Sequence, residues 1–165
     1  QAGIIIGKRQ YIEAMKKNPL TRAFRIDKLT LAALEATLRE YLDPADALEH
    51  NPTLRMITAT METLQPKGER LLACMQKVCD GSFRVSLTED FGQVGGGSVP
   101  TQMIRSSVVA IEPDHVSLDE LEKRLRELSL PIIARISKER LLLDVRTIEE
   151  HHFEYVAQSI KECCQ

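Results

Sequence analysis

The sequence lacks long hydrophobic runs. No uninterrupted apolar stretch approaches the roughly 20 residues that a membrane-spanning helix needs. Residues 1–6 have neither the charged leader nor the cleavage site of a signal peptide. With 43% hydrophobic residues in a length of 165, the chain can still bury a core. We therefore expect a soluble, cytoplasmic protein that makes no membrane contact.

The sequence also lacks the cysteine and histidine spacings of metal sites. Its four cysteines include no C-x-x-C pair, and Cys163 and Cys164 are adjacent, which suits a disulfide poorly. His151 and His152 are neighbours on an expected helix, where their side chains diverge by about 100°. We therefore predict reduced thiols and no metal site.

A surplus of positive charge is missing as well. The net charge is −2, so the chain as a whole has no electrostatic surface for nucleic acid. A local basic patch at Lys8, Arg9, Lys16 and Lys17 is compatible with this total. If RNA is a partner, we expect its main site to lie elsewhere.

The most informative segment that is present spans residues 20–29. Arg22 and Arg25 are three residues apart, a spacing that brings two side chains to the same side of a helix or turn. Both planar guanidinium groups could then bind one phosphate-like anion from one direction. The alternative is that both arginines are solvated side chains ahead of an ordinary packed helix. That helix is expected over residues 30–42, with Asp27 as N-cap and an apolar stripe of Leu31, Leu34, Leu38 and Tyr41.

The remaining periodicities predict a mixed α and β chain. Before residue 20 we expect a short buried strand over residues 2–7 and a helix over residues 11–17. The proline-containing segment 43–54 is the best candidate for a domain boundary. After it we expect a helix starting near Pro66, strands at 83–87 and 103–111, a helix at 118–128 capped by Ser117, strands at 131–136 and 141–145, and a final helix through residues 153–160. This order is typical of a two-layer α+β domain with a largely antiparallel sheet.

Two further features have open interpretations. Gly95, Gly96, Gly97 and Ser98 lie in a glycine-rich stretch that could line a cleft between domains or form an ordinary loop. The chain begins on Gln1 and runs directly into an apolar segment, so we expect it to be a piece of a longer protein.

Several separated stretches together resemble one known family. They occur in the same order as in bacterial selenocysteine synthase, the L-seryl-tRNA(Sec) selenium transferase family, and they are residues 1–7, 20–38, 52–56, 95–100 and 140–147. The resemblance implies a fold type I transferase dependent on pyridoxal phosphate, with an α/β fold. Residues 1–43 would then be the end of the large cofactor-binding domain with its linking helix. Residues 44–165 would be the small C-terminal α+β domain.

The resemblance also implies a reaction and a site. The family converts seryl-tRNA(Sec) to selenocysteinyl-tRNA(Sec) with selenophosphate as donor, and Arg22 and Arg25 match its arginine pair for the donor's phosphate. Its cofactor-binding lysine lies upstream of the position matching Gln1. We therefore expect no catalytic residue in this piece, no activity from it alone, and no substitute role for Lys8. The family forms homo-oligomers built of dimers.

Two alternatives stay open. The chain could be the small domain of another fold type I enzyme, such as a cysteine desulfurase-like lyase, if the arginine pair proved irrelevant to a phosphate donor. It could also be a non-catalytic α+β dimerisation module, which the composition alone allows.

Overall fold

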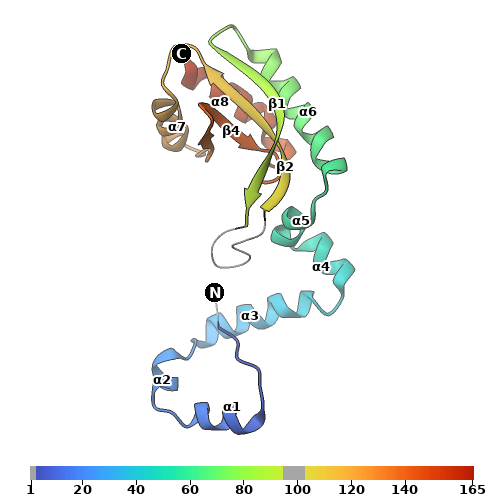
Figure 1. Ribbon diagram of the computed structural model, residues 1–165, viewed down its shortest axis with the longest axis vertical. Coiled ribbons are helices and arrows are strands. Elements are labelled where there is room, and N and C mark those ends of the chain that lie inside the picture. Colours follow the sequence, from blue (N-terminus) through green and yellow to red (C-terminus); the bar gives the residue numbers. More distant parts are fainter. Residues whose placement is uncertain (1–2, 95–102) are drawn as a thin grey trace. The chain divides into compact units, whose positions relative to one another are not determined.

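The chain forms two compact units, Gln1–Arg55 and Met56–Gln165. The computed structural model describes residues 3–94 and 103–165. The first unit is helical within the described residues (Figure 1), and α5 crosses into the second unit. Its helices are α1 (Arg9–Lys16), α2 (Leu20–Phe24), α3 (Lys28–Glu40), α4 (Pro44–His50) and α5 (Pro52–Thr58).

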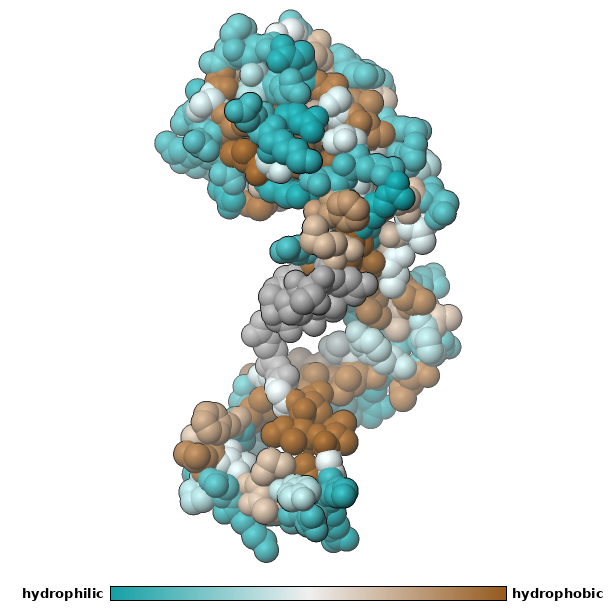
Figure 2. All heavy atoms as spheres, in the orientation of Figure 1, coloured by the Kyte–Doolittle hydropathy of each residue, from teal (hydrophilic) through white to brown (hydrophobic). Residues whose placement is uncertain are grey.

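The predicted strand over residues 2–7 is wrong for the part that the structure describes. Residues 3–8 have no regular secondary structure, and Ile4, Ile5 and Ile6 are 61%, 70% and 91% exposed. A strand needs a neighbour to accept its backbone hydrogen bonds, and the four-stranded sheet of the described residues does not include residues 3–7. The apolar run therefore lies at the surface of this unit. Figure 2 shows hydrophobic residues on the surface of both units.

Helix α3 begins as predicted but is not packed as predicted. The Asp27 carboxylate accepts hydrogen bonds from the backbone N–H groups of Leu29 (2.8 Å) and Thr30 (2.9 Å), which confirms the N-cap. None of the residues of α3 is buried. Leu31 and Tyr41 of the apolar stripe are 54% and 50% exposed, so the stripe lacks a full partner among the described residues.

Helices α4 and α5 cover most of segment 43–54, for which the sequence indicated a domain boundary and no helix. Asp43 accepts a hydrogen bond from the backbone N–H of Ala45 (2.9 Å), and Pro44 occupies the first turn of α4. Proline at the first helical position loses no hydrogen bond, because that N–H has no partner in a helix. Asp43 and Pro44 thus start a helix here as well as ending the previous one.

The second unit has the predicted order of helices and strands. An antiparallel sheet runs in the order β1-β2-β4-β3, with helices on it (Figure 1). Its elements are α6 (Met61–Val78), β1 (Phe83–Gln93), β2 (Met103–Pro113), α7 (Leu118–Glu127), β3 (Arg135–Ser137), β4 (Arg140–Asp144), a 3-10 turn (Glu150–His152) and α8 (Phe153–Cys164). The two-layer α+β prediction is confirmed for this unit.

The core lies between one face of the sheet and the helices. Cross-strand partners Val109 with Leu143 and Ile111 with Leu141 are at most 1% exposed. They belong to the same buried cluster as residues of α6, α7 and α8. Burying one large apolar side chain contributes about 1.5–3 kcal/mol, so this cluster is the main source of stability of the unit.

Two predicted boundaries in this unit were wrong. Helix α6 starts at Met61, and Pro66 lies inside it, because the buried Leu64 extends the packed face towards the N-terminus. The strand predicted over 131–136 is reduced to β3. The Ile132 N–H donates to the Leu125 carbonyl (3.0 Å) at the end of α7, so the start of this segment bonds to a helix rather than to β4.

Helix α6 approaches the sheet closely at Gly68. A Cβ atom there would lie 2.6 Å from Ser107 Oγ and 2.7 Å from Leu87 Cδ1. We expect Gly68→Ala to lower the free energy of unfolding by about 1–2 kcal/mol, because overpacking outweighs the gain in helix propensity. Urea unfolding of the chain measures the change in the free energy of unfolding. The control is Ala73→Gly on the exposed face of α6, which measures the difference in helix propensity between alanine and glycine without any change in packing. Unchanged stability of Gly68→Ala would contradict the close approach.

Asp80 links the end of α6 to the end of α8. Hydrogen bonds from Ser82, together with Gln165 and Lys161, lower the pKa of Asp80 to about 2. A lowered pKa in the folded state adds stability that is present above the ordinary value of 3.8 and is lost as the pH falls towards 2. We expect Asp80→Asn to flatten the pH dependence of unfolding in this range. If the free energy of unfolding of the wild type and of Asp80→Asn fell equally as the pH was lowered through this range, the expectation would be contradicted.

Among the residues that the structure describes, no helix combines the length and the apolar character needed to cross a membrane.

Candidate anion-binding site

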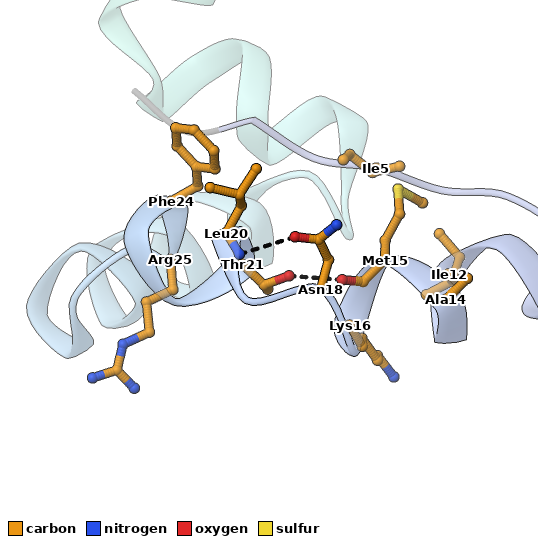
Figure 3. A pocket seen from close by; sticks show the side chains of 10 residues that line it. All are labelled: Ile5, Ile12, Ala14, Met15, Lys16, Asn18, Leu20, Thr21, Phe24 and Arg25. Carbon is orange, nitrogen blue, oxygen red and sulfur yellow. Dashed lines mark hydrogen bonds between the residues drawn. The ribbon is translucent and has the colours of Figure 1, made fainter.

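The site predicted from the sequence follows a tight turn between α1 and α2. The Asn18 side-chain oxygen accepts a hydrogen bond from the Leu20 N–H (3.0 Å), and the Thr21 hydroxyl donates to the Met15 carbonyl (2.7 Å). Figure 3 shows both bonds. They fix the start of α2 against the end of α1. The position of Asn18 two residues before Leu20 is the sequence signal for this turn, because asparagine side chains often accept a hydrogen bond from the backbone two residues on.

Arg22 and Arg25 lie on either side of the end of α2. Arg22 is helical, whereas Arg25 follows the last helical residue, Phe24, with an extended backbone (φ −67°, ψ 138°). The spacing of one continuous helix, from which the shared face was predicted, therefore does not apply between them. Both residues are exposed. Because each follows the fixed turn, both arginines belong to one short segment held by Asn18 and Thr21.

An apolar hollow adjoins this turn. Its volume is about 610 Å³. Figure 3 shows that Ile5, Met15, Leu20 and Phe24 extend to one side of the segment, whereas Arg25 and Lys16 extend to the other. The lining is formed by Ile5, Ile12, Ala14, Met15, Lys16, Asn18, Leu20, Thr21, Phe24 and Arg25. The segment therefore has an apolar side and a cationic side. This hollow was not predicted from the sequence, although the apolar residues before Lys8 were its signal.

The acids near the arginine pair do not neutralise it. Asp27 is engaged in capping α3, and its pKa is lowered, chiefly by the hydrogen bond from the Thr30 hydroxyl. Glu13 is bound to Lys16 at 3.2 Å. Within the described residues, neither Arg22 nor Arg25 makes a side-chain hydrogen bond or an ion pair. Both guanidinium groups are thus available to an external anion.

The other predicted site residues add nothing to this geometry. Gly95, Gly96, Gly97 and Ser98 lie outside the described residues. In the ranges 3–94 and 103–165, no cluster of three or more His, Cys, Asp or Glu side chains could hold a metal ion.

Comparison with known proteins gives a consistent result. The family model described as L-seryl-tRNA selenium transferase matches residues 1–149. The L-seryl-tRNA(Sec) selenium transferases of Alkaliphilus metalliredigens and Clostridium botulinum are each 46% identical to this chain over 98% of its length. The enzyme of Alkaliphilus oremlandii is 42% identical over 100% of it. These matches cover 34%, 35% and 35% of the respective relatives, so the chain spans about a third of their length.

Fold and site together define a mixed α and β protein, in which a helical unit with exposed arginines precedes a two-layer domain on an antiparallel sheet. The chain belongs to the L-seryl-tRNA selenium transferase family. This membership confirms the resemblance drawn from the sequence and agrees with the fold class that it implied.

Proposed function

We propose that this chain is the C-terminal part of an enzyme that converts seryl-tRNA(Sec) to selenocysteinyl-tRNA(Sec) with selenophosphate. The observation that carries the proposal is the exposed pair Arg22 and Arg25, unpaired within the described residues and located in the segment that the family model matches. The names of the relatives support the same reaction.

In this proposal Arg22 and Arg25 bind the phosphate of the donor. Guanidinium groups present paired N–H donors to oxyanions, and they keep their charge at any physiological pH. By holding the phosphate, the two arginines orient the donor and fix the position of its selenium. The fixed turn at Asn18 and Thr21 limits how far Arg22 can move, which lowers the entropy cost of binding.

Pyridoxal phosphate, when bound, supplies the electron sink for exchange of the seryl hydroxyl. The residues of this chain do not fit its covalent site. An imine-forming lysine is usually desolvated, and none of the nine lysines here is buried. We propose that a lysine elsewhere in the transferase binds the cofactor, and we expect the chain alone to be inactive.

We also propose that the end of the large domain extends through residue 43, followed by the small domain over residues 44–165. The exposed apolar side chains of the first unit, such as Ile6 (91%), Phe24 (79%) and Leu29 (84%), support a large contact with other parts of the transferase. In this view the intact enzyme is a cytoplasmic homo-oligomer built of dimers.

Selenium transfer by the full-length transferase that contains this chain tests the proposal. Purified enzyme, seryl-tRNA(Sec) and radiolabelled selenophosphate should give selenocysteinyl-tRNA(Sec), identified after hydrolysis of the ester. Release of sulfur from free cysteine, without transfer from selenophosphate, would instead indicate a desulfurase. Absence of both activities in enzyme loaded with pyridoxal phosphate would refute the proposal and favour the alternative of a non-catalytic dimerisation module.

A further inference from the structure

The charges of the chain are distributed very unevenly. Residues 1–28 contain seven basic and two acidic residues, a net charge of +5, whereas residues 29–165 contain 15 basic and 22 acidic residues, a net charge of −7. The total of −2 therefore hides a strongly basic segment. Such charge asymmetry is a typical sign of a surface for a polyanion.

The cations of this segment differ from those of the second unit in their pairing. In the second unit, carboxylates pair with Arg70, Arg84, Arg105, Arg124, Arg126 and Arg135. Of the seven cations in the first 28 residues, Lys16 alone has a carboxylate within 4.0 Å among the described residues. All seven are exposed. The positive electrostatic potential of this surface is therefore not cancelled by neighbouring carboxylates. An anion that binds there has to break few existing ion pairs.

The arrangement suits an extended anion better than a small one. A single phosphate needs no more than the pair Arg22 and Arg25. Of the other five cations, Lys28 is the first residue of α3. The remaining four lie at the two ends of α1, with Lys8 and Arg9 at its start and Lys16 and Lys17 at its end. Arg9 and Lys16 are two turns apart on one face, about 10 Å along the helix axis. One strand of a nucleic-acid duplex presents about three phosphates over that length.

The apolar and cationic sides of the segment are separate. Lys16 and Arg25 extend away from Ile5, Leu20 and Phe24 (Figure 3). The apolar side can therefore be covered by protein while Lys16 stays open to solvent.

We propose that Lys8, Arg9, Lys16 and Lys17, at the two ends of α1, form a surface that binds the phosphate backbone of the tRNA substrate, next to the arginine pair for the donor. This inference rests on the proposed function, which supplies a tRNA as the substrate. The surface should bind RNA without sequence specificity, because contacts from lysine and arginine to phosphates do not depend on the identity of the bases. It positions the RNA, and the chemistry occurs elsewhere.

Binding of unacylated tRNA(Sec) to the full-length transferase, measured by fluorescence anisotropy over a range of KCl concentrations, tests this proposal. The triple variant Lys8→Gln, Arg9→Gln, Lys17→Gln should bind roughly 10–100-fold more weakly near 0.15 M salt. Its slope of log affinity against log salt should be shallower by about 2–3 units, because each lost phosphate contact removes about 0.9. The matched control is Lys77→Gln, Lys123→Gln, Lys138→Gln, which removes three exposed cations of the second unit and should change neither quantity.

Two further measurements separate this role from others. The charge-preserving variant Lys8→Arg, Arg9→Lys, Lys17→Arg should bind tRNA(Sec) like the wild type, which would show that binding depends on the charges and not on the identity of these side chains. At saturating tRNA, the selenophosphate dependence of transfer should be unchanged in the triple glutamine variant. If wild-type enzyme failed to bind tRNA(Sec), the proposed function itself would be refuted.

If the wild type bound and the triple glutamine variant kept its affinity and salt slope, this inference alone would be overturned. A change in oligomer mass of that variant by light scattering, with unchanged tRNA binding, would also overturn it and assign the surface to a protein contact.

Discussion

Replacing Arg22 or Arg25 with alanine is expected to weaken the use of selenophosphate by roughly 10–100-fold. A charge-assisted hydrogen bond contributes about 1.5–3 kcal/mol, and each guanidinium has no competing partner among the described residues. The loss should appear as a higher donor concentration for half-maximal selenium transfer. Replacement by lysine should preserve little of the donor use at either position. A point charge on a flexible side chain does not reproduce the paired N–H donors of the planar guanidinium group.

Arg39→Ala is the matched control for both variants. Arg39 is an exposed arginine of the same unit and is paired with Glu35 (2.8 Å), so its removal should leave donor use unchanged. The absorbance change that seryl-tRNA(Sec) causes in the bound cofactor should be the same in all variants, since that step does not involve the donor. Equal loss of this signal and of selenium transfer would show that the arginines serve something other than the donor's phosphate.

Replacing Arg146 with alanine is expected to lower the free energy of unfolding of the second unit by about 2–4 kcal/mol. Its guanidinium donates hydrogen bonds to the carbonyls of Met56 and Ala59 (3.0 Å), near the end of α5, and of Arg105 (2.7 Å) on β2. Burial lowers the pKa of Arg146, although nearby Asp144 opposes this shift. Without the side chain, several part-buried carbonyls lose their donor.

Urea unfolding monitored by circular dichroism measures this effect. Arg126→Ala removes an exposed arginine paired with Glu122 one helical turn away, and it should cost at most about 0.5 kcal/mol. Arg146→Lys should recover only part of the loss, since an ammonium group cannot reach carbonyls on two elements at once. An Arg146→Ala protein as stable as the control would refute this linking role.

The second unit was largely predictable because its elements carry local signals. Ser117 accepts a hydrogen bond from the Glu120 N–H (3.2 Å), as the capping pattern predicted. The alternating residues of β1 and the apolar run of β4 indicated strands directly. The shortening of β3 could not be predicted, since it depends on the Ile132 N–H bonding to Leu125 in another element.

The first unit was less predictable because most of its large apolar side chains are exposed within the described residues. Residues 4–6 have the composition of a strand, yet a strand requires a neighbour that no local pattern reveals. For the site, the sequence identified Arg22 and Arg25 as a pair, but it could not place the end of α2 between them. That break arises at Arg25, whose extended backbone leads to the Asp27 cap of α3.

The central claim, that Arg22 and Arg25 hold the donor's phosphate, is tested most directly by calorimetric titration of thiophosphate into the full-length transferase. Thiophosphate has the shape and charge of selenophosphate but lacks its selenium. We predict saturable binding to the wild type and to Arg39→Ala, and binding at least tenfold weaker to the double variant Arg22→Ala, Arg25→Ala. Equal thiophosphate binding by the wild type and the double variant would contradict the claim.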